Sequence, residues 1–223
     1  MKNLQPEIYP SILTADLGFL ANQIIEAEYY GVNGFHIDIM DGQFVPNITF
    51  GTAIVKTIRK FTALPLDIHL MVIKPERFFD ELVSLGVDNI SVHYEATDNL
   101  KELLLCLNKY DVKTSLAINP DTELSLITPY VETIDRLLIM SVHPGYGGQK
   151  FITTSLKKIR AAKELLLSTS KPKELQVDGG INHATIKDVT TSGANIVVAG
   201  SSIYNDKDDI GNSIKKLKSS LNQ

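Results

Sequence analysis

Short apolar runs alternate with helical periodicity along the whole chain, and this alternation limits the fold more than any other feature. Eight runs rich in branched residues predict β-strands, at residues 7–11, 34–39, 66–70, 89–93, 114–118, 136–140, 175–178 and 196–199. Several of them carry branched residues on both faces, as parallel strands do when both faces of the sheet are covered. The pattern therefore predicts an α/β protein with a parallel sheet.

The segments between these runs have apolar residues spaced by three and four. That spacing predicts amphipathic helices, most clearly over residues 19–30, 74–85, 99–110 and 153–167. Gly31, Gly86 and Gly193 stand where the chain turns from a helix toward the next strand, a position that favours the left-handed backbone of glycine.

Eight strand–helix units favour a closed (β/α)₈ TIM barrel, with an open doubly wound sheet as the alternative. We expect one domain over residues 1–223, since a chain with 43% hydrophobic residues can build a single large core. Polar residues follow strands throughout the chain, which favours the barrel because all eight strand ends then meet at one mouth. They are Ser11, His36, Asp38, His69, His93, Asn119, His143, Asp178 and Ser201.

The charge balance argues against a nucleic-acid partner, since 22 basic and 26 acidic residues give a net charge of -4. The N-terminal residues lack the apolar segment of a secretory signal, and no stretch is long enough to span a bilayer. The single cysteine, Cys106, excludes an intramolecular disulfide framework and is expected to be a small buried residue on a helix. These features predict a soluble cytoplasmic protein without a membrane partner.

A candidate metal site comes from residues on three predicted strands. His36 and Asp38 are two residues apart in an apolar run, so both point to the same face of their strand. Together with His69 and Asp178 they offer two imidazoles and two carboxylates. This donor set suits one divalent zinc, iron, manganese or cobalt ion per chain better than magnesium or calcium.

Glycine-bearing loops after three consecutive strands predict a phosphate site. The sixth strand is followed by SVHPGYGGQKF, the seventh by a glycine pair, and the eighth by AGSSI before a short expected helix. Backbone N–H groups of such loops can bind an anion, and this end of a barrel is a usual phosphate site. The candidate residues are Gly145, Tyr146, Gly147, Gly148, Gly179, Gly180, Gly200 and Ser201.

The remaining methionines and histidines complete the expected pocket. Met40, Met71 and Met140 stand near strand ends and could wall a dry pocket around the reacting carbon. His93 is expected at the rim or behind the ligands, whereas His143 and His183 are given no role beyond possible contact.

Two carboxylates at one metal indicate inversion at a carbon beside a carbonyl. A metal that binds both oxygens of a hydroxyketone stabilises the enediolate formed on deprotonation. One carboxylate, Asp38 or Asp178, can then remove a proton from one face while the other returns a proton to the opposite face.

These motifs resemble the ribulose-phosphate 3-epimerase family over nearly the whole chain. The matching segments are PSILTAD, HIDIMDGQFVPNITFG, DIHLM, SVHPGYGGQKF, VDGG and AGSSI, in family order. The resemblance implies a ribulose-phosphate-binding (β/α)₈ barrel that interconverts D-ribulose 5-phosphate and D-xylulose 5-phosphate. It also implies that Asp38 and Asp178 are the acid–base pair and that Ser11 and His69 touch the substrate.

Two alternatives stay open beside this interpretation. D-allulose-6-phosphate 3-epimerase shares the HIDIMDG motif and performs the same inversion on a hexulose phosphate. A barrel that binds phosphosugars without catalysis would be expected to have lost a ligand or a carboxylate. The expected partners are a small phosphorylated ketose and further copies of the chain in a homo-oligomer.

Overall fold

Eight parallel strands form the centre of the fold in a computed structural model that describes residues 5–221. They are β1 (Glu7–Pro10), β2 (Phe35–Met40), β3 (Leu66–Met71), β4 (Asn89–His93), β5 (Lys113–Ile118), β6 (Arg136–Met140), β7 (Glu174–Asp178) and β8 (Ile196–Ala199). The sheet order is β1-β8-β7-β6-β5-β4-β3-β2, and one bridge between Ser11 and His36 closes the ring. The barrel prediction is confirmed, and every predicted strand end lies within one residue of the observed end.

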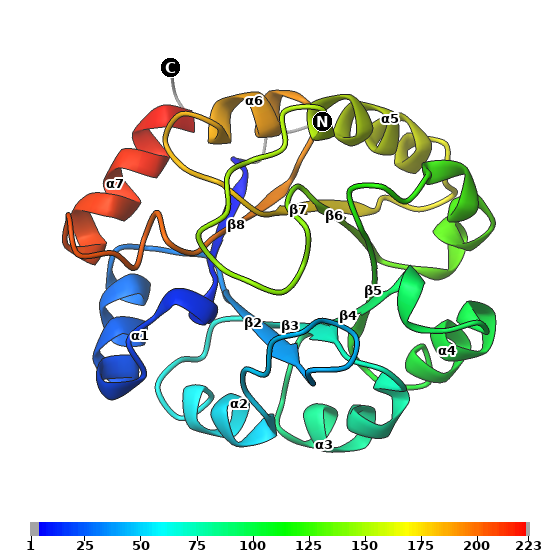
Figure 1. Cartoon of the computed structure of the whole chain (residues 1–223), viewed down its shortest axis with the longest axis horizontal. Coiled ribbons are helices and arrows are strands. Elements are labelled where there is room, and N and C mark those ends of the chain that lie inside the picture. The colour runs from blue at the N-terminus through cyan, green and yellow to red at the C-terminus, as the bar shows by residue number, and fades with distance from the viewer. Residues whose placement is uncertain (1–4, 222–223) are drawn as a thin grey trace.

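Helices surround the ring of strands on its outer side (Figure 1). They are α1 (Leu20–Tyr29), α2 (Thr52–Ile58), α3 (Phe79–Ser84), α4 (Leu100–Leu107), α5 (Ser155–Leu167), α6 (Ile186–Thr191) and α7 (Ile210–Leu221). The helix predicted over residues 74–85 begins as a 3₁₀ turn, η3 (Pro75–Phe78), and continues as α3. Between β5 and β6 the connection is made by 3₁₀ turns, η5 (Leu124–Leu126) and η6 (Thr128–Thr133). No helix within residues 5–221 has both the length and the apolar character to cross a bilayer.

The two faces of each strand bury different kinds of side chain. One face carries residues such as Ile37, Ile68 and Leu116, which pack with the helices in a continuous apolar core. Cys106 on α4 packs against this core while remaining partly exposed. The other face points into the barrel and is unusually polar, since His36, Asp67, Asn89, Arg136 and Gln176 are all buried. Buried polar groups require partners, and Asp67 accepts hydrogen bonds here from Asn89 and Gln176.

Three glycines end helices as the sequence predicted. Gly31, Gly86 and Gly193 have φ angles of 76°, 74° and 120°. Because side chains disfavour this backbone region, glycine is the residue that lets each helix stop and turn toward its strand.

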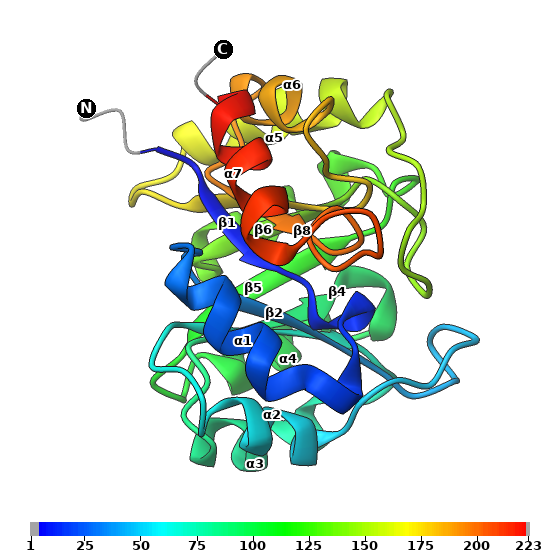
Figure 2. The ribbon, with the colours of Figure 1, turned by 90° about the vertical axis from the view of Figure 1, so that its left-hand side faces the viewer.

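The loops that follow the strands gather at one end of the barrel (Figure 2). In Figure 1 the loop after β6 crosses over the ring of strands. This loop and the loop after β2 are joined by a 3.0 Å hydrogen bond from Asn47 Nδ2 to the carbonyl oxygen of Gly145. The carboxyl ends of the strands therefore lie beneath a connected set of loops.

Candidate active site

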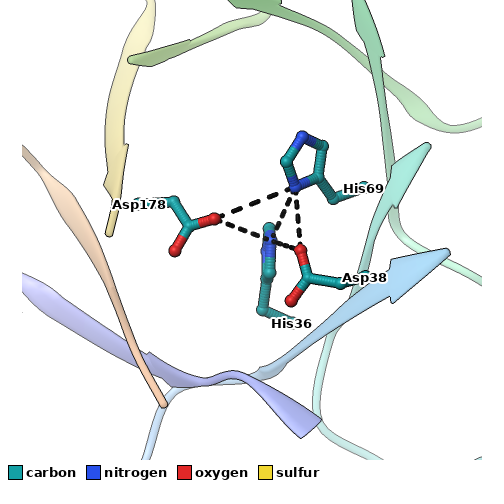
Figure 3. A group of neighbouring side chains, drawn as sticks. All are labelled: His36, Asp38, His69 and Asp178. Carbon is teal, nitrogen blue, oxygen red and sulfur yellow. Dashed lines mark hydrogen bonds and ion pairs between the residues drawn. The ribbon is translucent and has the colours of Figure 1, made fainter. Parts of the chain in front are cut away.

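Two histidines and two aspartates from three strands point toward one another inside the barrel (Figure 3). His36 and Asp38 come from β2, His69 from β3 and Asp178 from the end of β7. Each offers one ligand atom, and all four atoms lie within 4.8 Å of one another. The structure thus brings together the four residues that the sequence singled out.

The spacing of the donor atoms fits one transition ion. Four tetrahedral ligands at about 2.1 Å from an ion lie about 3.4 Å from one another. His36 Nε2 lies 3.3 Å from Asp38 Oδ1 and 3.8 Å from Asp178 Oδ2. His69 Nδ1 lies 2.9 Å from Asp38 Oδ1 and 3.9 Å from Asp178 Oδ2. The donor set and its spacing could therefore hold one metal ion.

Asp38 is buried and held ionised. Its Oδ2 accepts a 2.6 Å hydrogen bond from Ser11 Oγ, while its Oδ1 faces the two imidazoles. Burial alone would raise the pKa of Asp38, but the charge of His36 and the contacts of the carboxylate with the imidazoles of His36 and His69 outweigh it and lower this pKa.

Asp178 differs from Asp38 in exposure and in acidity. Its side chain is 16% exposed, against 4% for Asp38. Among the protein's own groups, burial and then the charge of Asp38 raise the pKa of Asp178 to about 7. A pair of nearby carboxylates with separated pKa values is what acid–base catalysis at neutral pH requires.

A buried ion-pair network lies beneath His36. Its Nδ1 is 2.7 Å from Asp67 Oδ2, and Asp67 also accepts a hydrogen bond from Gln176 and lies 3.2 Å from Arg136. Burial opposes the charge of His36, but the carboxylates of Asp38 and Asp67 raise its pKa well above the ordinary value. Despite burial, His36 and Arg136 lower the pKa of Asp67. The network fixes the orientation of the His36 ring.

His93 lies behind His69 and is fully buried, so of its two expected places it takes the one behind the candidate ligands and not the one at the rim. The two rings stack with centroids 5.0 Å apart, and their Nε2 atoms are 2.8 Å apart. His93 Nδ1 is 3.0 Å from Glu95 Oε2. Burial lowers the pKa of His93 to about 4. The pKa of Glu95 is also lowered, to about 2, because the interactions with His93, Thr122 and Asn119 outweigh the effect of burial.

A cavity opens above the four candidate ligands, under the loop after β6. The two carboxylates line it, whereas His36 and His69 are fully buried below. His69 therefore lies among the candidate ligands and does not line the cavity, where the substrate contact that the resemblance implied would be expected. The other predicted residues line this cavity: Ser11, Met40, Met71, Met140, Gly145, Tyr146, Gly147, Gly148, Gly179, Gly180, Gly200 and Ser201.

The three methionines end their strands. Met40, Met71 and Met140 are the last residues of β2, β3 and β6, and each is at most 3% exposed. Unbranched thioether side chains give the cavity an apolar wall beside the carboxylates.

The glycine pair after β7 is required by close packing with the loop after β6. Gly179 and Gly180 have φ angles of 120° and 66°. A Cβ on Gly179 would lie 2.8 Å from the backbone nitrogen of Val142, and one on Gly180 would clash with the backbone of Phe151. Ser141 Oγ joins the two loops by donating to the carbonyl oxygens of Asp178 and Gly179, at 2.9 and 2.7 Å.

The short helix expected after Ser201 is instead a hydrogen-bonded turn. The carbonyl oxygen of Gly200 accepts from the N–H groups of Ile203 at 2.8 Å and Tyr204 at 3.1 Å, and α7 begins only at Ile210. His143 and His183 are exposed loop residues, and His143 lies 3.8 Å from Asp121.

Sequence reasoning gave no role to Asp67, Arg136 or Glu95. The alternation of β3 carried a signal for Asp67, since it is two residues before His69 and must share its face. Glu95 follows a strand and offers no such signal, because its position depends on the turn η4 (Tyr94–Ala96).

Comparison with known proteins agrees with this geometry. The model of the ribulose-phosphate 3-epimerase family matches residues 7–204. The chain belongs to this family. It is 42% identical to the ribulose-phosphate 3-epimerase of Bacillus subtilis (strain 168), over 91% of this chain and 94% of that relative. It is also 39% identical to the chloroplastic enzyme of Arabidopsis thaliana, over 96% of this chain and 76% of the relative.

Solved structures support the architecture alone. A tryptophan synthase α-subunit from Pyrococcus furiosus superposes with a TM-score of 0.72 at 17% identity and covers 98% of each chain. Orotidine 5'-phosphate decarboxylase from Pyrococcus horikoshii gives 0.70 at 11% identity, over 97% of this chain and 99% of that one. The family's barrel is thus shared with proteins of different sequence.

Proposed function

We propose that this epimerase interconverts D-ribulose 5-phosphate and D-xylulose 5-phosphate by moving a proton at C3. The single observation that carries the proposal is the meeting of Asp38 and Asp178 at one cavity above two buried imidazoles. The names of its relatives in the family supply the substrate class.

The two carboxylates would act as acid and base on opposite faces of the sugar. Asp38 comes from β2 and Asp178 from β7, which are separated in the ring by β1 and β8. One would remove the C3 proton, and the other, in its protonated form, would deliver a proton from the far side. Ser11 would hold Asp38 in place through the 2.6 Å hydrogen bond.

His36, Asp38, His69 and Asp178 would hold one divalent transition ion, for which zinc, iron, manganese and cobalt are candidates. When bound, the ion would favour negative charge on the hydroxyketone oxygens and so acidify C3. The methionine wall would keep water from the same carbon.

The phosphate would bind at the loops after β6, β7 and β8. Gly147, Gly148, Gly180, Gly200 and Ser201 line the cavity. Backbone N–H groups in such loops suit a phosphate dianion. Anchoring the phosphate there would set the distance along the sugar to the carbon that reacts.

Rates on two substrates would test the proposal. Turnover of ribulose 5-phosphate should exceed that of allulose 6-phosphate when both are measured on the same preparation. Faster turnover of the hexulose phosphate would assign the chain to the allulose reaction. Binding of both compounds without exchange of the C3 proton into deuterated water would indicate a phosphosugar-binding barrel.

The setting of the enzyme is part of the proposal. We expect a single domain that acts in the cytoplasm as a homo-oligomer, without a nucleic-acid partner. The net charge of -4 supports the last point, and the exposed Phe19 and Tyr29, 64% and 82% accessible, offer apolar surface for self-association. Sedimentation velocity would give the oligomeric state.

A further inference from the structure

Behind His69 lies a chain of polar groups, two buried histidines and a partly buried glutamate, that the proposed reaction does not use directly. It runs from His69 to His93 and on to Glu95, with contacts of 2.8 Å between the two Nε2 atoms and 3.0 Å from His93 Nδ1 to Glu95 Oε2. The ring of Phe44 packs on His93 with centroids 4.9 Å apart. Each of these contacts can hold only one proton, so the protonated nitrogen of one ring determines which nitrogen of the next ring is protonated.

Glu95 can only accept hydrogen bonds along this chain. Its Oε1 accepts from the N–H of Asn119 at 2.9 Å and from the hydroxyl of Thr122. Its Oε2 is left for His93, so Nδ1 of His93 must carry a proton. A neutral His93 then has its lone pair on Nε2.

The same logic continues to His69. The lone pair on His93 Nε2 must receive the proton of His69 Nε2, and a neutral His69 then has its lone pair on Nδ1. That atom faces the four-donor cluster, 2.9 Å from Asp38 Oδ1. A lone pair so close to a carboxylate is favourable only with a cation between them.

We propose that Glu95, acting through His93, is a positioning residue that fixes the tautomer of His69 and presents its Nδ1 lone pair to a metal ion. This inference rests on the proposed metal site. Asp67 contacts Nδ1 of His36 directly, at 2.7 Å. The two ligand imidazoles are therefore each oriented by a carboxylate, His36 directly by the buried Asp67 and His69 through a second ring by the partly buried Glu95.

The variant Glu95→Gln gives a sharp test because it keeps the shape of the side chain and replaces one hydrogen-bond acceptor with a donor. The N–H of Asn119 and the hydroxyl of Thr122 keep the amide oxygen of the glutamine at the position of Oε1. The amide nitrogen therefore takes the position of Oε2 and donates to His93 Nδ1. His93 is then protonated at Nε2 instead of Nδ1, and His69 at Nδ1 instead of Nε2. Rotating the amide would avoid this only by leaving the buried N–H of Asn119 against a donor.

Zinc titration of metal-free protein by calorimetry measures the effect. Glu95→Gln should bind zinc about 10- to 100-fold more weakly than the wild type. Glu95→Ala should lose less, since it offers no opposing donor. If Glu95 acted only by filling space, Glu95→Ala would lose more zinc affinity than Glu95→Gln. A zinc affinity of Glu95→Gln that equals or exceeds that of Glu95→Ala therefore overturns the proposal. Glu123→Gln, which removes an exposed carboxylate from the neighbouring loop, should bind like the wild type.

A second measurement needs no variant. Nitrogen-15 spectra of zinc-loaded wild-type protein should show His93 protonated at Nδ1 and His69 at Nε2. Protonation of His93 at Nε2 overturns the inference even if the variants fail to fold. A wild type that binds no zinc would overturn the metal site together with this inference, whereas a wild type that binds zinc beside an unaffected Gln variant overturns the inference alone.

Discussion

Ser11 Oγ donates a 2.6 Å hydrogen bond to Oδ2 of Asp38, and the other oxygen of that carboxylate faces two imidazoles. The two oxygens of Asp38 therefore have different partners. Ser11 also lines the cavity, so one hydroxyl can orient the carboxylate and meet the substrate. This relationship makes Ser11 more than the substrate contact expected from the resemblance.

Removing that hydroxyl should slow the reaction. We expect Ser11→Ala to lower kcat about 10- to 100-fold, because a hydrogen bond to a charged group contributes about 1.5–3 kcal/mol. Steady-state rates in both directions would measure the loss. Ser84→Ala, which removes an exposed hydroxyl on α3, is the matched control. An unchanged kcat in Ser11→Ala would show that Asp38 does not depend on Ser11.

Each catalytic carboxylate should serve one stereoisomer. Asp38→Asn and Asp178→Asn should each lose several orders of magnitude in epimerisation, since each removes a general base and a candidate ligand. Each variant should still exchange the C3 proton of one epimer into deuterated water, and the two should prefer different epimers. Near-normal epimerisation by either variant in both directions would exclude the two-base scheme.

Purified protein should carry about one divalent transition ion per chain. Chelation should abolish turnover, and zinc, manganese, cobalt or iron should restore it. His69→Ala should weaken metal binding, because one of the four donors is lost. Elemental analysis beside activity assays would check these points, and full activity in exhaustively metal-free protein would contradict them.

The loop after β6 should close further when the phosphate binds. Gln149 already braces its tip by donating to the carbonyl oxygens of His143 and Tyr146, yet the Tyr146 side chain is 58% exposed. A phosphorylated substrate analogue should protect the amides of residues 143–149 from hydrogen exchange. Residues 168–173, on the connection into β7, should exchange equally with and without the analogue. Equal exchange in both loops would argue against closure.

Asp41 should make the loop after β2 sensitive to acid. Its Oδ1 accepts from the N–H groups of Gln43 and Phe44, and its Oδ2 accepts from that of Ile73. Burial opposes these hydrogen bonds, but they lower the pKa of Asp41. A lowered pKa stabilises the fold above the unfolded value of about 4, and this contribution is lost as the pH falls through the folded value.

The variant Asp41→Asn places an amide N–H against that of Ile73, so it should cost about 1–2 kcal/mol of unfolding free energy at pH 7. The difference from wild type should shrink at pH 3. Urea unfolding at both pH values would measure it, with the exposed Asp98→Asn as control. A difference that grows at pH 3 would mean that Asp41 does not act through its charge.

The strands were predictable because buried parallel strands are short, apolar and bounded by turn residues. The helices were less so. Pro75 begins its helix as a 3₁₀ turn, and the segment after Ser201 makes one hydrogen-bonded turn where a short helix was expected. Such details depend on competition between local hydrogen bonds, which hydrophobic periodicity does not report.

The grouping of the four candidate ligands was predictable since strand alternation fixes which side chains enter the barrel. The depth at which each histidine ring is buried relative to the cavity was not predictable from the sequence. His69 and His93 are fully buried and do not line the cavity, although β3 reaches it through Met71. The contact of Glu95 with His93 was also hidden, because it depends on the turn η4 that follows the strand.

The barrel closes between β1 and β2 through a single bridge, and that bridge joins Ser11 to His36. Closing the ring and completing the site are therefore one event. A molecule in which β1 has come away from β2 has also separated Ser11 from Asp38, so it keeps most of its strands and helices but not its catalytic arrangement. During refolding, activity should consequently return only once β1 has paired with β2, and enzyme assays would report on barrel closure where circular dichroism would not.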